Sequence, residues 1–216
     1  MRLFQPGPSL TLLVDSPLAA AWLEALWDGA AIQVLSIGAP VVSALVAAAR
    51  AEGQTRVFGF TGRGFGSENR HRWARPPADL HTYVAPVFDL ESYLVGPDDP
   101  VPTPDLCRWM AARHLLADTA RAATAGLPTE GIAETILASG WFSTVARDLG
   151  ELSDPEWVQA ELSRLEALYA KAPRSAFPGG RLLAGLDEDQ ARARGRAARD
   201  QTPGDIVALM ASLEGR

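Results

Sequence analysis

Three short apolar segments, separated by segments of helical character, constrain the fold of this chain more than any other feature. The first reads Leu-Thr-Leu-Leu-Val at residues 10–14, and the others occupy residues 31–37 and 56–61. After the first segment, Ser16 and Pro17 form the N-cap and first position of a helix. Strands that alternate with helices of about 10 to 15 residues are typical of an α/β fold with a mainly parallel sheet.

After the third strand, the pattern of expected elements changes from alternating strands and helices to mostly helices. A fourth strand is expected at residues 80–84, and a proline-rich stretch follows it. We therefore predict an α/β domain of about four strands at residues 1–96, a linker at 97–104, and an α-helical region at 105–216 packed on that domain. Helices are expected at residues 105–124, 129–139, 141–149, 153–171, 188–199 and 203–213.

The charge pattern bears on nucleic-acid binding. The net charge is −6, so any contact with DNA or RNA must come from a local basic segment. One such segment follows the third strand, with aromatic residues interleaved; its basic residues are Arg63, Arg70, His71, Arg72 and Arg75. It predicts contact with phosphates and stacking on bases. The alternative is a solvated arginine-rich loop.

The location of the protein is inferred from its cysteine content and its hydropathy. Its single cysteine, Cys107, excludes an internal disulfide and a multi-cysteine metal site. Neither a signal peptide's apolar core nor an apolar window of about 18 residues is present. We expect a cytoplasmic protein with no membrane partner.

Acidic residues follow the first strand and occupy a segment after the fourth. Asp15 ends the first strand, where ligands bind in open parallel sheets, and Asp89 and Glu91 lie in the later segment. Carboxylate oxygens are suitable ligands for Mg²⁺ or Mn²⁺. The structural alternatives are that Asp15 supports the following helix and that Asp89 is a helix N-cap.

The order of these features resembles the TOPRIM domain of the overcoming-lysogenization-defect nucleases and related bacterial defence proteins. In that family a first strand ends in Val-Glu-Gly followed shortly by Asp, and a third strand ends in Asp-x-Asp. A later segment reads acidic or hydroxyl residue, x, Glu, x-x-Leu. The corresponding segments here are Val-Asp-Ser at 14–16, Gly-Arg-Gly at 62–64 and Asp-Leu-Glu-Ser-Tyr-Leu at 89–94. The resemblance covers about residues 10–94, and Phe-Pro-Gly-Gly-Arg at 177–181 is similar to a Gly-Lys motif of these proteins.

The departures from that pattern fall on its metal-binding positions. The family's glutamate corresponds to Asp15, which is shorter, and Arg181 follows the position of the family's lysine. The other acidic or basic motif positions are occupied by Ala19, Gly62, Gly64 and Gly180. The resemblance therefore implies a catalytically degenerate binding or assembly subunit of a bacterial nucleic-acid-processing or anti-phage defence system. If the site is degenerate, no metal cofactor is needed.

Two other functions remain open from the sequence. One is an active Mg²⁺- or Mn²⁺-dependent nuclease in which Asp15, Asp89 and Glu91 hold the ion, with Asp15 and Glu91 as catalytic residues. There, Arg63 or Arg181 would steady the charge on the phosphate. The other is a nucleotide-sensing module that uses the amides of the glycine loop. The resemblance also implies an ATPase or another protein of a defence system as partner, and a homo-oligomer stays open.

Overall fold

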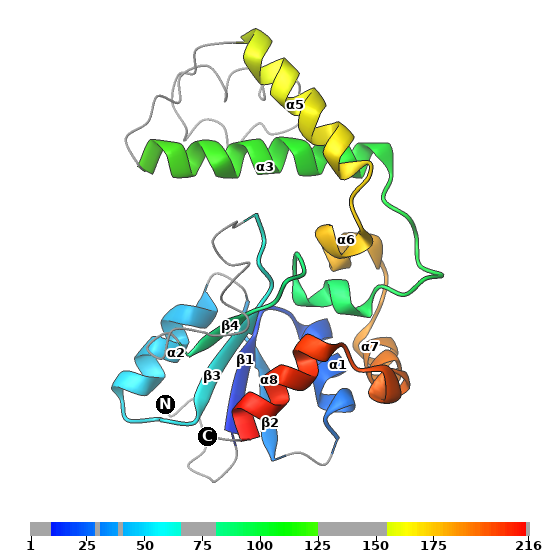
Figure 1. The fold of residues 1–216 in the computed structure, drawn as a ribbon. Coiled ribbons are helices and arrows are strands. Elements are labelled where there is room, and N and C mark those ends of the chain that lie inside the picture. The colour runs from blue at the N-terminus through cyan, green and yellow to red at the C-terminus, as the bar shows by residue number, and fades with distance from the viewer. Residues whose placement is uncertain (1–9, 29–30, 39–40, 66–80, 125–154, 215–216) are drawn as a thin grey trace. The chain divides into compact units, whose positions relative to one another are not determined.

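The computed structural model describes residues 10–28, 31–38, 41–65, 81–124 and 155–214. The chain divides into two compact units (Figure 1). The first contains residues 1–100 and 177–216, and the second contains residues 101–176. The expected helices at 129–139 and 141–149 lie outside the described residues.

A four-stranded parallel sheet forms the centre of the first unit. Its strands are β1 (Leu10–Val14), β2 (Ile32–Ser36), β3 (Val57–Thr61) and β4 (Thr82–Val84), in the order β2-β1-β3-β4. Every residue of β1 is buried, as expected for a central strand with cover on both faces. The predicted α/β class and the parallel sheet are confirmed.

One face of the sheet carries the larger core. Helix α1 (Pro17–Leu26) packs there with α7 (Glu188–Ala197) and α8 (Gly204–Glu214). The contributors from β1 are Leu10, Leu12 and Val14, and Trp22 of α1 is 2% exposed. As predicted, Ser16 caps α1: its Oγ accepts a hydrogen bond from the Ala19 amide at 3.1 Å. Burial of this apolar surface stabilises the unit.

The opposite face is covered by α2 (Val42–Ala51), which packs Val42 and Val46 against Leu13 and Val57. Gly59 of β3 permits this contact, because a Cβ there would lie 2.7 Å from Val42 Cγ1. The two faces together explain why β1 and β3 are continuous apolar runs.

The C-terminal helices belong to the same unit as the sheet. The expected division grouped residues 105–216 as an α-helical region packed on the α/β domain; in the structure, residues 177–216 form one compact unit with the sheet. Helix α7 packs against α1 (Figure 1) and approaches it closely at Gly195, where a Cβ would overlap the Trp22 carbonyl oxygen. The short helix α6 (Gly179–Leu182) contacts the 3₁₀ helix η3 (Leu90–Leu94). Residues far apart in sequence thus complete the first unit.

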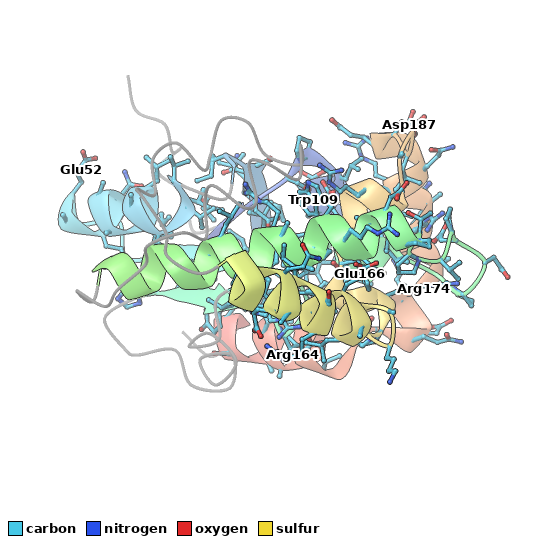
Figure 2. All side chains as sticks on the ribbon, turned by 90° about the horizontal axis from the view of Figure 1, so that it is seen from above. Glu52, Trp109, Arg164, Glu166, Arg174 and Asp187 are labelled. Atoms are coloured by element: carbon cyan, nitrogen blue, oxygen red, sulfur yellow. The ribbon has the colours of Figure 1, made fainter. Side chains whose placement is uncertain are left out.

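The second unit, as described, consists of α3 (Pro104–Thr124), α5 (Pro155–Tyr169) and the 3₁₀ helix η5 (Arg174–Ala176). Arg108 Nε donates to Glu166 Oε1 at 3.0 Å, and the Tyr169 hydroxyl lies 3.0 Å from His114 Nδ1. Figure 2 labels Trp109 on α3 and Glu166 on α5. Cys107 is buried in this unit.

Among the helices that the structure describes, none is long and apolar enough to cross a membrane.

Candidate functional site: three carboxylates at the edge of the sheet

The end of β1 meets the end of β3 through Asp15. The Gly62 amide donates a hydrogen bond to Asp15 Oδ2 at 3.2 Å. Asp15 Oδ1 is buried and, within the described ranges, has no hydrogen-bond partner. This carboxylate therefore joins two strand ends and keeps one oxygen uncompensated, which is costly for a buried charge.

Asp89 joins η3 to α6. Its Oδ1 accepts from the Ser92 amide at 2.9 Å and the Ser92 hydroxyl at 2.7 Å, which makes Asp89 the predicted N-cap. The Gly179 amide also donates to Asp89, at 2.9 Å from Oδ1 and 3.1 Å from Oδ2. The Ser92 hydroxyl lies 2.8 Å from the Phe177 carbonyl oxygen. A single carboxylate thus caps one helix and anchors the start of another, 90 residues away.

Glu91 lies against the Gly-Gly pair of α6. A Cβ on Gly180 would overlap Glu91 Oε2, and a Cβ on Gly179 would overlap the Glu91 carbonyl carbon. The Ser16 hydroxyl and the Gly180 amide both hydrogen-bond the Glu91 carboxylate. Glu91 therefore contacts the start of α1 and the start of α6.

The three carboxyl groups are close enough to influence one another's ionisation. Burial raises the pKa of Asp15 to about 6; the Gly62 hydrogen bond opposes this, and the charges of Asp89 and Glu91 add to it. Burial also raises the pKa of Asp89, against the hydrogen bonds from Gly179 and Ser92. For Glu91, burial raises the pKa, hydrogen bonding from Ser16 lowers it, and the Asp89 charge raises it. Protons are therefore held more tightly here than on exposed carboxyl groups.

The metal implied by the family resemblance can be compared with this donor set. Divalent ions need several oxygens with lone pairs directed at one point. Here Asp89 Oδ1 accepts three hydrogen bonds, and amides approach all three carboxylates. In the described ranges, no group of three or more His, Cys, Asp or Glu side chains is arranged to hold a metal ion. The hydrogen bonds to Asp89 and Glu91 fit amide donors rather than a cation, whereas Asp15 Oδ1 has no donor among the described residues.

The glycine loop after β3 is paired with the segment that precedes η3. The Arg63 amide donates to the Val87 carbonyl at 3.0 Å, and the Gly64 amide donates to the Phe88 carbonyl at 2.8 Å. Since the Gly62 amide donates to Asp15, three successive amides are engaged. These three amides are therefore not available to cradle a phosphate, which requires unpaired donors.

The replaced motif positions have different environments. A Cβ on Gly62 would overlap the Asp89 Cα and lie 2.7 Å from the Asp89 nitrogen, whereas a Cβ on Gly64 would meet nothing within 4 Å. Gly64 adopts a φ of +53°, which favours glycine. Ala19 is fully buried in the core of the first unit, where an aspartate would be an unpaired charge.

The predicted nucleic-acid contacts are described only in part. Arg63 lies in the loop that pairs with Val87, and Arg181 is exposed on α6. The other residues assigned to this surface, Arg70, His71, Arg72 and Arg75, lie outside the described residues.

Sequence reasoning missed the role of two features. Ser92 is 6% exposed and bridges Asp89 and Phe177, although nothing in its sequence context distinguishes it. In the sequence, Gly180 stands out only as the position that corresponds to the lysine of the family that the chain resembles. Two adjacent glycines at the start of a short helix permit a close backbone approach, and here the approaching group is η3.

No protein-family model, curated protein or solved structure matches this chain.

Proposed function

We propose that this chain is a TOPRIM-like binding or assembly subunit of a bacterial nucleic-acid-processing or defence system, without catalytic activity of its own. The observation that carries the proposal is the use of the carboxylates. Asp15, Asp89 and Glu91 lie at the edge of the sheet where ligands bind in such folds, and each accepts hydrogen bonds from backbone amides. They hold strand ends and helix starts together, which is a structural role.

The glycine positions support the same proposal. Gly62 and Gly180 are not simply acidic or basic residues that were lost, because the backbone of Asp89 and the carboxylate of Glu91 occupy the space beside them. Recovery of a metal site would require these segments to move apart. A chain under selection for metal-dependent phosphodiester cleavage would keep that space open for the ion and its substrate.

Metal binding and cleavage provide the first test. Mg²⁺ and Mn²⁺ are titrated by calorimetry into the full chain and into the Asp15→Asn and Glu91→Gln variants, with supercoiled plasmid incubated in parallel. We expect neither millimolar-range heat of binding nor nicking in any of the three proteins. Metal binding and nicking by the parent, with both lost in either variant, would establish an active nuclease and overturn the proposal.

Nucleic-acid binding is tested separately. Fluorescently labelled single- and double-stranded DNA and RNA are titrated with the parent, with an Arg70→Gln/Arg72→Gln double variant, and with Arg181→Gln. Each lost phosphate contact should weaken binding and reduce the salt dependence of the affinity by about one unit of slope. Arg196→Gln is the matched control, because Arg196 is exposed on α7 and outside the predicted surface. Equal effects of all the variants would rule out a localised nucleic-acid surface.

A further inference from the structure

The first unit contains a second feature that the proposed function does not use. A cavity of about 560 Å³ is lined by α1, by the segment that follows η3, and by the end of α7. None of the three site carboxylates lines it. The lining residues that matter for its chemistry are Trp22, Tyr93, Asp98, Asp99, Arg194 and Gln201. Its volume is in the range of small-molecule sites.

An aromatic pair forms one wall of this cavity. The rings of Trp22 and Tyr93 are stacked, with centroids 5.7 Å apart and planes at 4°. The Tyr93 hydroxyl donates to Asp205 Oδ2 at the start of α8. The ring is therefore fixed both by stacking on Trp22 and by the hydrogen bond of its hydroxyl group. Trp22 is buried and Tyr93 is half-buried. Tyr93 therefore presents a fixed aromatic surface to the cavity.

Hydrogen bonds fix another part of the lining. Arg194 Nη2 donates to Asp99 Oδ1 at 2.8 Å, and Arg194 Nη1 donates to the Leu94 carbonyl at 2.6 Å. The Gly96 amide donates to Asp99 Oδ2 at 2.6 Å. The segment after η3 is thus tied to α7 and to itself, and the cavity is largely formed before any ligand enters, which reduces the entropic cost of binding.

The charges around the cavity indicate which ligands it accepts. Asp98, Asp99 and Arg194 are the charged lining residues, and the Arg194 guanidinium is paired with Asp99. This leaves the exposed carboxylate of Asp98 at the rim as the excess charge. An anionic ligand would be repelled, whereas a cationic group would be attracted by Asp98 while its apolar body packs on the aromatic wall.

We propose that this cavity binds a small organic cation, an amine or amidinium group carried on an aromatic or aliphatic body. The apolar body lies against Tyr93 and the neighbouring apolar wall, and the cationic group lies toward Asp98. This site is separate from the carboxylate cluster and does not depend on the function proposed for it.

The test uses three probes of nearly the same shape and different charge. Phenethylamine, phenethyl alcohol and phenylacetate are titrated by calorimetry into the full chain at low salt. We expect the amine to bind most tightly and its affinity to fall as salt is added. Equal binding of all three, or no binding of the amine up to its solubility limit, would overturn the proposal.

Two variants locate the site. Asp98→Asn should weaken amine binding roughly two- to fivefold, as for loss of an exposed ion pair, and should leave phenethyl alcohol unaffected. Tyr93→Leu should weaken binding of the amine and of phenethyl alcohol alike, on the order of tenfold, with circular dichroism confirming that the variant folds. Glu52→Gln is the control, because Glu52 is exposed at the end of α2 (Figure 2) and does not line the cavity. A loss of affinity in Glu52→Gln equal to that in Asp98→Asn would place binding elsewhere.

Discussion

Asp15 gives the sharpest prediction from this structure, because its ionisation opposes folding at neutral pH. Burial and the neighbouring charges raise its pKa from the ordinary value of 3.8 to about 6. A carboxyl group with a raised pKa binds its proton more tightly in the folded state than in the unfolded state. The free energy of unfolding should therefore increase as the pH falls through about 6 toward about 4.

The size of the effect follows from the shift. At 1.36 kcal/mol per pKa unit, a rise from 3.8 to about 6 corresponds to about 3 kcal/mol of unfolding free energy. Asp15→Asn removes the charge but keeps an oxygen that can accept from the Gly62 amide. Since the asparagine NH₂ group also needs a partner, the gain at about pH 8 should be smaller, about 1 to 2 kcal/mol. Near pH 4 the variant should show no gain.

The measurement combines urea unfolding of parent and variant at several pH values with ¹³C NMR titration of the Asp15 carboxyl carbon, which does not depend on two-state unfolding. Asp98→Asn is the matched control, because it removes an exposed carboxylate from the same unit. An Asp15 pKa near 4, or a variant that is less stable than the parent at pH 8, would refute the reasoning.

Three further predictions test the close contacts around the site and the core. Gly62→Ala should lower the free energy of unfolding by about 2 to 3 kcal/mol, because its Cβ meets the Asp89 backbone. Gly64→Ala should lower it by only about 1 to 2 kcal/mol, because the positive φ at this position disfavours alanine. Urea unfolding compares the two, and equal costs would contradict the close approach. Gly195→Ala should lower the melting temperature, although alanine is favoured over glycine within helices by about 1 kcal/mol; a raised melting temperature would mean that α1 and α7 are not in tight contact. Ser92→Ala should lower the free energy of unfolding by about 1 to 3 kcal/mol, because it removes the hydroxyl that bonds Asp89 and Phe177 and leaves buried polar groups unpaired. Ser43→Ala, on the exposed side of α2, should leave the free energy of unfolding unchanged or raise it. Chemical denaturation of both serine variants checks this, and similar values would exclude the Ser92 bridge.

The parts of the fold that sequence reasoning predicted are those with local signals. The span of β1 and the Ser16 cap were predicted correctly because an apolar run and an N-cap are properties of neighbouring residues. The placement of α7 was not predicted. Its buried residues are Ala191 and Gly195, so its sequence has no apolar stripe that would indicate packing on α1. Its contact depends on the absence of a side chain at Gly195, and a sequence pattern does not show which backbone will approach.

The candidate site shows the same limit. The sequence identified Asp15, Asp89 and Glu91, because acidic residues after strands are visible in a single chain. It did not predict that Gly179 would donate to Asp89, since this contact joins residues 90 positions apart and has no spacing rule. The role of each carboxylate was therefore decided by partners that only the folded chain brings near.

The same glycines also determine what could rebuild a metal site. Gly62 corresponds to an acidic position of the resembling family, so Gly62→Asp is the obvious restoration. In this fold the first side-chain atom at that position would overlap the Asp89 Cα, before any carboxylate reached a ligand position. A lysine at position 180 would likewise have to displace the Glu91 carboxylate. Each restored residue would disturb an acid that the restored site needs, so single substitutions should destabilise the protein without conferring metal binding, and reversal would require η3 to move together with both glycine positions.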